Sequence, residues 1–276
     1  MRLSTVRRPG GQTAAGRVEG DEIVLLPYAS VGTLIASGPD WKEAAAAPGG
    51  ETVALDDADL APLVPQPPKI VCMGLNYATH LREMGRTPPT HPTLFAKYAS
   101  SLIGPTDDIV VPPVTDAVDW EGELAFVIGT TVRFADEPAA RAAIAGYTVM
   151  NDITMRDWQF RTLQFLQGKT FEGSTPLGPA LVTPDELGDA GDLALRTLVN
   201  GEVMQKSRTS DLLFPAAEIV RYVSQFMTLV PGDVLTTGTP GGVGHGRDPK
   251  VYLTDGDVVT VEIEGVGTTR NTIRSA

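Results

Sequence analysis

Short apolar runs, separated by glycine, proline and aspartate, recur along the whole chain. Such runs predict many short β-strands, here at residues 3–6, 14–18, 22–26, 69–74, 94–97, 109–111, 124–128, 146–151, 193–199, 234–237, 251–253, 258–263 and 271–273. Apolar residues at helical spacing predict fewer helices, at residues 30–37, 76–84, 139–145 and 214–226, with a helix or a broken helix from 153 to about 167 and an Ala-rich helical turn within 40–48. Asn200-Gly201 is typical of a hairpin turn. The balance predicts a mainly β protein of class α+β.

One proline-dense segment divides this pattern. Residues 61–68 contain Pro62, Pro65, Pro67 and Pro68, so they cannot be helical and favour extended geometry. We therefore expect a small N-terminal α/β domain over residues 1–64 and a larger domain over residues 69–276.

The composition narrows the class of protein. A chain of 276 residues with 42% hydrophobic content can bury one large core, or a large and a small one. The net charge of -12 argues against nucleic acid as a partner, although a metal and a few cations could still bind an anionic substrate. Cys72 is the only cysteine, which excludes an intrachain disulfide and fits a reducing cytoplasm. The chain shows no secretory signal pattern and no run of 18 apolar residues, so we expect no membrane partner.

Glu121 and Glu123 are the first candidates for chemistry. They lie two residues apart in a predicted strand, so both side chains point from the same face. Asp152 follows another apolar run and would complete an all-oxygen set suited to Mg²⁺ or Mn²⁺. Two alternatives remain open, namely a solvated edge strand for the glutamates and a helix N-cap for Asp152.

His80 and Glu83 are candidates for acid–base work. On the helix predicted for residues 76–84 they lie three residues apart and share a face, so the carboxylate can orient the imidazole. A surface ion pair is the alternative interpretation.

Three further polar residues follow Asp152 closely. Arg156 and Gln159 would share a helical face, where they could hold a substrate carboxylate. Lys169 could stabilise an enolate or an oxyanion. The alternative is that all three are ordinary surface residues.

Residues 236–244 form a Gly/Thr-rich stretch after a predicted strand. It lacks the Gly-Lys-Ser/Thr of a phosphate-binding P-loop, so a tight loop that lines a pocket is the better interpretation. We expect His245, in the glycine-rich turn that follows, to be flexible or structural rather than catalytic.

The order of these motifs resembles the fumarylacetoacetate hydrolase family over about residues 69–274. The motifs that carry the resemblance are Gly74-Leu75-Asn76-Tyr77-x-x-His80-x-x-Glu83, Trp120-Glu121-x-Glu123-Leu124, Asn151-Asp152-x-Thr154-x-Arg156-Asp157-x-Gln159, Lys169-Thr170-Phe171, Pro176-Leu177-Gly178-Pro179, Asn200-Gly201-Glu202 and Pro231-Gly232-Asp233 with Thr237-Gly238-Thr239-Pro240.

The resemblance implies a mixed β-sandwich roll, in a homodimer, with a site built from ten residues. In this site Mg²⁺, or in some members Mn²⁺ or Ca²⁺, is held by acids, and a histidine–glutamate dyad activates water, while other side chains bind the oxo-acid substrate. The corresponding residues are Glu121, Glu123 and Asp152 for the metal, His80, Glu83 and Lys169 for catalysis, and Tyr77, Arg156, Gln159 and Thr239 for the substrate. Gly74-Leu75-Asn76 offers no further acid, so water would complete the metal's coordination. Lys97 lies where many members have Lys-Pro, but Tyr98 follows here and the role of Lys97 stays open.

The function expected from these residues is hydrolysis of a C–C bond in an acylpyruvate or fumarylpyruvate-type 2,4-dioxo acid, through a metal-chelated enolate, in aromatic or amino-acid breakdown. The same residues would serve an isomerase or decarboxylase of the 2-hydroxyhepta-2,4-diene-1,7-dioate or oxaloacetate type. A non-catalytic small-molecule-binding homologue is the alternative from another class.

Overall fold

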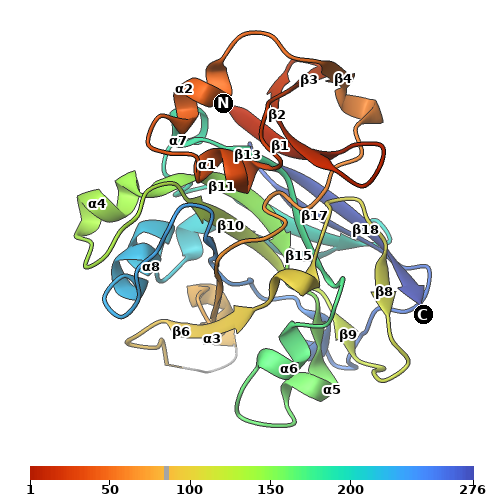
Figure 1. The fold of residues 1–276 in the computed structure, drawn as a ribbon. Coiled ribbons are helices and arrows are strands. Elements are labelled where there is room, and N and C mark those ends of the chain that lie inside the picture. The colour runs from red at the N-terminus through yellow and green to blue at the C-terminus, as the bar shows by residue number, and fades with distance from the viewer. Residues whose placement is uncertain (84–86) are drawn as a thin grey trace.

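The computed structural model describes residues 1–83 and 87–276, without the side chains of His80 and Glu83. A large mixed sheet forms the centre of the molecule (Figure 1). Its strands follow one another in space as β4 (Thr52–Ala54), β3 (Glu22–Leu25), β2 (Thr13–Glu19), β1 (Arg2–Arg7), β13 (Thr175–Val182), β11 (Ile144–Asn151), β10 (Gly122–Ile128), β16 (Val234–Thr236), β5 (Ile70–Gly74) and β6 (Thr93–Lys97), with β7 (Leu102–Ile103) paired to β13.

A second, smaller sheet and a two-stranded ribbon complete the β-structure. The smaller sheet has the order β15 (Glu202–Arg208), β14 (Ala194–Val199), β17 (Val258–Ile263), β18 (Gly267–Ser275) and β8 (Ile109–Val111), and the ribbon pairs β9 (Val118–Asp119) with β12 (Thr154–Met155). Between β14 and β15, Asn200 and Gly201 have φ of 51° and 84°, the geometry of a tight hairpin turn.

The described helices are short. They are α1 (Val31–Ile35), α2 (Trp41–Ala46), α3 (Ala78–Glu83), α4 (Glu137–Ala142), α5 (Arg156–Gln159), α6 (Leu166–Lys169), α7 (Pro184–Leu187) and α8 (Ala216–Val223), with 3₁₀ turns at Leu55–Asp57, Ala99–Ser101, Thr209–Asp211 and Gly244–Gly246. The α+β prediction is confirmed. Among the described residues, no helix combines the length and apolarity of a membrane span.

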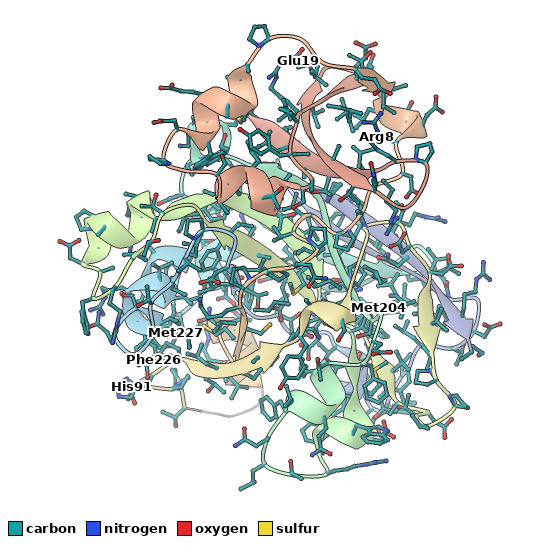
Figure 2. All side chains as sticks on the ribbon, viewed as in Figure 1. Arg8, Glu19, His91, Met204, Phe226 and Met227 are labelled. Carbon is teal, nitrogen blue, oxygen red and sulfur yellow. The ribbon has the colours of Figure 1, made fainter. Side chains whose placement is uncertain are left out.

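Strand β10 is buried on both faces of the large sheet. Leu124 and Phe126 pack in the core that contains α8, whereas Ala125 and Val127 pack in the core that contains α1 and α2. In Figure 2 side chains fill the interior between the elements, while Arg8, in the turn between β1 and β2, and Glu19, at the end of β2, lie on the outside of the N-terminal strands. A glutamate placed on β10 is therefore forced into the interior.

The N-terminal residues extend the large sheet. Leu3 of β1 pairs with Leu181 of β13, and both side chains belong to the core that contains Ala125. Figure 1 shows β1–β4 with α1 and α2 at one end of the molecule and α5 and α6 at the other. The division at residues 61–68 stays a prediction, but residues on either side of it share a sheet and a core.

The sequence pattern did not predict every element correctly. Strand β13 was missed because Pro176 and Pro179 argue against a central strand. Residues 251–253 form no strand, and only Leu253 makes a bridge, to Val118. For residues 153 to about 167 the broken-helix alternative is confirmed, since α5 and α6 are separated by a turn.

Truncating Leu3 tests whether β1 is part of the common core. Leu3→Ala leaves a cavity at a fully buried position and is expected to lower the free energy of unfolding by about 2–5 kcal/mol. Urea unfolding measures the change. Leu163→Ala, at a position 97% exposed, is the control and should leave the midpoint unchanged. An unchanged midpoint for Leu3→Ala would contradict the shared core.

Candidate active site

Glu121, Glu123 and Asp152 converge at the end of the β10–β11 pair. The pairing of Gly122 with Asn151 places Glu121 opposite Asp152, whose N–H donates to the Glu121 carbonyl at 2.9 Å. One carboxylate oxygen from each of the three lies within 4.8 Å of the others. All three residues are buried, so the solvated-edge interpretation of the glutamates was wrong.

The N-cap interpretation of Asp152 was also wrong. The next helix, α5, begins four residues later and has Met155 at its N-cap position. The Asp152 carboxylate is instead held by two lysines, with Oδ1 at 2.6 Å from Lys97 Nζ and Oδ2 at 2.8 Å from Lys169 Nζ. Burial raises the pKa of Asp152, but the positive charges of Lys169 and Lys97 outweigh burial and hold that pKa below its usual range.

Lys169 joins two of the acids. Its Nζ lies 2.5 Å from Glu121 Oε2 as well as 2.8 Å from Asp152. Burial lowers the pKa of Lys169, but Asp152 and Glu121 more than reverse this, so the pKa is raised and the ammonium stays charged. The position of Lys169 depends on Gly168, because a Cβ there would lie 2.5 Å from the Gln159 nitrogen on α5. The surface interpretation of Lys169 was wrong.

Glu123 differs from the other two acids in its partners. Among the described residues no basic side chain pairs with it, and its carboxylate accepts a hydrogen bond from the Gly238 N–H at 3.2 Å. Burial, followed by the charges of Asp152 and Glu121, raises its pKa well above the usual value. An all-oxygen cluster with one such carboxylate fits a divalent cation, which would supply the missing positive charge. The three acids could therefore hold a metal ion.

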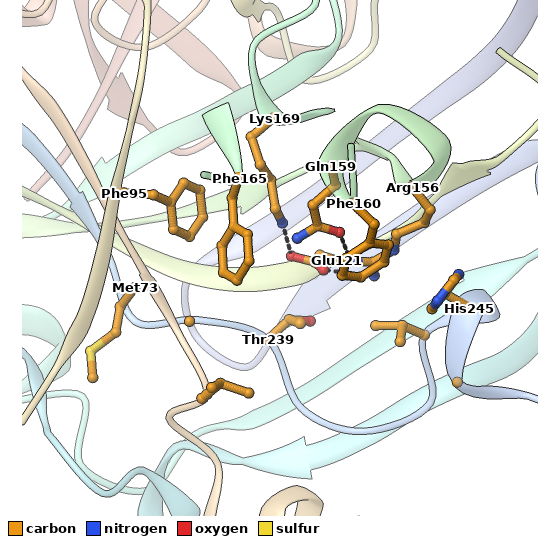
Figure 3. A pocket seen from close by; sticks show the side chains of 14 residues that line it. Met73, Phe95, Glu121, Arg156, Gln159, Phe160, Phe165, Lys169, Thr239 and His245 are labelled. Atoms are coloured by element: carbon orange, nitrogen blue, oxygen red, sulfur yellow. Dashed lines mark hydrogen bonds and ion pairs between the residues drawn. The ribbon is translucent and has the colours of Figure 1, made fainter. Parts of the chain in front are cut away.

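Arg156 and Gln159 lie inside the site rather than on the surface. The Arg156 guanidinium bridges Asp119, through Nε at 2.8 Å, and Glu121, through Nη2 at 2.7 Å. The Nη1 atom of Arg156 donates to Gln159 Oε1 at 2.9 Å. Because Arg156 takes the amide oxygen of Gln159, the NH2 group of this amide is left for the pocket (Figure 3). Arg156 is thus committed to acids of the chain, and Gln159 is the better donor for a ligand.

The acids lie beside a pocket of about 450 Å³. Figure 3 shows Lys169, Glu121, Gln159 and Arg156 on one side and the aromatic rings of Phe95, Phe160 and Phe165 around them. The complete wall also includes Met73, Gly74, Leu75, Thr239, Val243, His245 and Gly246. The pocket therefore has one charged side and a largely apolar remainder.

The Gly/Thr-rich loop lines this pocket, as predicted, through Thr239 and Val243. The Thr239 hydroxyl donates to the Gly122 carbonyl at 3.0 Å and accepts from Gln205 Nε2 at 2.8 Å. His245 lines the pocket too, with Nδ1 2.8 Å from the Tyr252 hydroxyl. Burial, then Lys250 and Arg156, lowers the pKa of His245, which favours the neutral ring.

Three predicted site residues stay untested by the geometry. His80 and Glu83 belong to α3, but their side chains lie outside the described part of the structure. Tyr77 is fully buried, with its hydroxyl unpaired among the described residues, and its side chain is not part of the pocket wall. The catalytic and substrate-binding roles of these residues remain predictions.

Sequence reasoning missed Asp119 and left the role of Lys97 open, and the structure places both charged residues in the site. Asp119 is fully buried against Arg156, and Lys97 is 3% exposed against Asp152. Asp119 directly precedes Trp120-Glu121, and Lys97 ends the apolar run of β6, so a charged residue at the end of a buried strand was the available signal.

Comparison with known proteins places most of the chain in one family profile. Residues 69–274 match the family described as fumarylacetoacetate (FAA) hydrolase C-terminal. Mitochondrial oxaloacetate tautomerase FAHD2A from Bos taurus is 48% identical over 216 residues, which cover 78% of this chain and 68% of that protein. A 2,4-didehydro-3-deoxy-L-rhamnonate hydrolase from Sphingomonas is 45% identical over 74% of this chain and 73% of its own.

Solved structures of similar proteins align with the whole length of this chain. Fumarylacetoacetate hydrolase from Exiguobacterium antarcticum aligns with a TM-score of 0.85 and 36% identity over 100% of both chains. A 2-hydroxyhepta-2,4-diene-1,7-dioate isomerase from Mycobacterium marinum aligns with a TM-score of 0.80 and 34% identity, over 100% of this chain and 98% of that one. The similar proteins are enzymes of more than one reaction type. Since some relatives are mitochondrial, the cytoplasmic location stays a prediction.

Two isosteric substitutions should affect the metal-free protein in opposite directions. Glu123→Gln removes a buried charge that no basic side chain of the described residues pairs with, and it is expected to stabilise the metal-free fold by about 1–3 kcal/mol. Glu121→Gln breaks ion pairs with Lys169 and Arg156 and should destabilise it. Thermal unfolding in chelator measures both changes, and repeating it with Mg²⁺ should show that neither variant gains the stabilisation expected for the wild type. If both variants change the stability of the metal-free protein in the same direction, the assigned pairing of the buried charges is contradicted.

The stability of the metal-free protein should also depend on pH through Glu123. Its folded-state pKa lies above the unfolded value of about 4.3, so the folded chain binds more protons and loses stability as pH rises through that folded-state pKa. Glu123→Gln lacks this loss, so its stability advantage over the wild type should grow as pH rises. Urea unfolding in chelator between about pH 5 and 9 measures the difference. A difference that shrinks with pH would refute the raised pKa.

Proposed function

Because the chain belongs to the fumarylacetoacetate hydrolase family and has its α+β fold, we propose that it is a Mg²⁺-dependent enzyme that moves a proton between the keto and enol forms of a 2-oxo acid. The observation that carries the proposal is the buried acid set beside a pocket. Glu121 and Lys169 line this pocket, and Lys169 bridges Glu121 and Asp152. The names of the similar tautomerases and isomerases support this reaction type. A homodimer remains part of the proposal.

The balance of buried charges suits an anionic substrate. Four carboxylates, of Asp119, Glu121, Glu123 and Asp152, face three basic side chains, of Lys97, Arg156 and Lys169. With all seven ionised, these described side chains carry one net negative charge. A divalent cation would reverse it to one net positive charge, which complements one substrate carboxylate.

The side chains of the pocket have separable roles in this reaction. A bound divalent cation supplies Lewis acidity that lowers the free energy of an enolate. The side-chain NH2 group of Gln159 donates a hydrogen bond to a substrate oxygen. Lys169 stabilises negative charge rather than accepting the proton, because its raised pKa keeps it protonated. His80 with Glu83 is the remaining proposed acid–base pair.

The apolar wall of the pocket favours proton transfer over attack by water. Met73, Leu75, Phe95, Phe165 and Val243 surround the charged side, and such walls strengthen electrostatic contacts and exclude bulk water.

Hydrolysis of a C–C bond in a 2,4-dioxo acid is the second candidate. The observation in its favour is the 45% identity to a hydrolase of a didehydro-deoxy sugar acid. For this reaction His80 and Glu83 would activate a water molecule instead of moving a proton on the substrate.

Solvent exchange separates the two candidates. The protein is incubated with Mg²⁺ in D₂O with oxaloacetate, an acylpyruvate and a 2-hydroxy-diene diacid, and products are followed by NMR. The proposal predicts faster deuterium incorporation at C3, or a shifted double bond, without chain cleavage. Glu123→Gln should lose this activity by about 100-fold or more, and chelator should abolish it.

Release of two acids from the acylpyruvate would favour the hydrolase instead. A rate unchanged in both chelator and Glu123→Gln would refute a metal-dependent enzyme of either kind.

A further inference from the structure

Asp119 is a fully buried carboxylate outside the proposed metal set, and all of its hydrogen bonds come from donors of the chain. Oδ1 accepts from the N–H groups of Trp120 at 2.9 Å and Gly244 at 2.7 Å. Oδ2 accepts from the His245 N–H at 2.9 Å and from Arg156 Nε at 2.8 Å. A carboxylate with four donors and no remaining contact to a ligand can act only through the groups that it holds.

We propose that Asp119 is a positioning residue that sets the cation affinity and the donor geometry of the site through Arg156. This proposal rests on the metal dependence proposed above. Arg156 spans three partners at once, Asp119 through Nε, Glu121 through Nη2 and Gln159 through Nη1. The direction of its guanidinium therefore fixes both a carboxylate of the acid set and the amide of Gln159.

The charge of Asp119 matters as well as its shape. Both carboxylate oxygens of Glu121 are engaged, one by Arg156 and one by Lys169. The Arg156 guanidinium is paired with both Asp119 and Glu121. Its single positive charge is therefore divided between two carboxylates, and Glu121 does not receive all of it. Without the second anion, Arg156 would bind Glu121 more tightly and compete with a divalent cation for it.

The same carboxylate ties two walls of the pocket together. Arg156 and Gln159 come from α5, whereas Gly244 and His245 come from the 3₁₀ turn that follows the Gly/Thr-rich loop. The approach is so close at this turn that a Cβ on Gly244 would lie 2.9 Å from Asp119 Oδ1. Asp119 thus holds His245 on the pocket wall while it orients Arg156.

Asp119→Asn is the direct test, with Asp233→Asn as its matched control. The introduced amide keeps the shape of the carboxylate but offers one acceptor oxygen and an NH2 group that faces N–H donors. Asp233 is equally buried and pairs with Lys69 at 2.7 Å and the Val230 N–H at 2.8 Å, away from the pocket wall. The control therefore reports the effect of removing a buried, ion-paired carboxylate charge outside the site.

The first readout is the affinity for Mn²⁺, titrated by electron paramagnetic resonance on folded protein. Asp119→Asn is expected to bind Mn²⁺ about 10–100-fold more weakly than the wild type, and Asp233→Asn within about twofold. If Asp119→Asn does not fold, Arg156→Lys replaces it, because a lysine cannot contact Asp119, Glu121 and Gln159 together. Wild-type affinity in the tested variant, or an equal loss in the control, would overturn the proposal.

The second readout needs no metal. The amides of Gly244 and His245 and the Nε–H of Arg156 should exchange slowly in the wild type and in Asp233→Asn, and fast in Asp119→Asn. If the wild type binds no Mn²⁺, the proposed metal dependence fails, and these exchange rates alone decide whether Asp119 positions Arg156. Unchanged exchange in Asp119→Asn would overturn that role.

Discussion

Four carboxylates and three basic side chains are buried together where β10 begins and β11 ends, and the rest of the site depends on their mutual compensation. An isolated buried carboxylate would cost several kcal/mol, and three of the four carboxylates, those of Asp119, Glu121 and Asp152, pair with basic side chains from other elements. Lys97 comes from β6, Lys169 from α6 and Arg156 from α5. The fold around the pocket is therefore tied together by charge, while the apolar cores position the strands that carry it.

The buried negative charge of Glu123 is the one that is least compensated, and the proposed cation would bind there. Asp152 has two lysines and Glu121 has a lysine and an arginine, but Glu123 has an amide N–H and no basic side chain among the described residues. A site that destabilises the empty protein in this way gains affinity for a cation. The apolar walls then keep water away from the charged side and strengthen its contacts with a substrate anion.

The sequence predicted the parts of this arrangement that are local. Two carboxylates at strand spacing, an acid after the next strand, and the turn at Asn200-Gly201 were all visible as patterns, and the motif order identified the family. The partners of the acids were not predictable in this way. Lys97 and Asp119 reach the site through the register of separate strands, and Arg156 had the pattern of a ligand-binding residue although it binds Asp119 and Glu121. The prolines of β13 argued against a central strand. The strands that pair with β13, namely β1, β7 and β11, lie in other parts of the sequence, so no local pattern revealed the pairing.

Anomalous diffraction from crystals grown with Mn²⁺ tests the central claim most directly, because it locates the cation without any assumption about the substrate. The account predicts one strong Mn²⁺ peak at coordination distance from the carboxylates of Glu121, Glu123 and Asp152, with Arg156 still bound to Asp119. A fully occupied Mn²⁺ peak at another place would contradict the account. So would the absence of a peak at saturating Mn²⁺ while Lys169 still bridges Glu121 and Asp152.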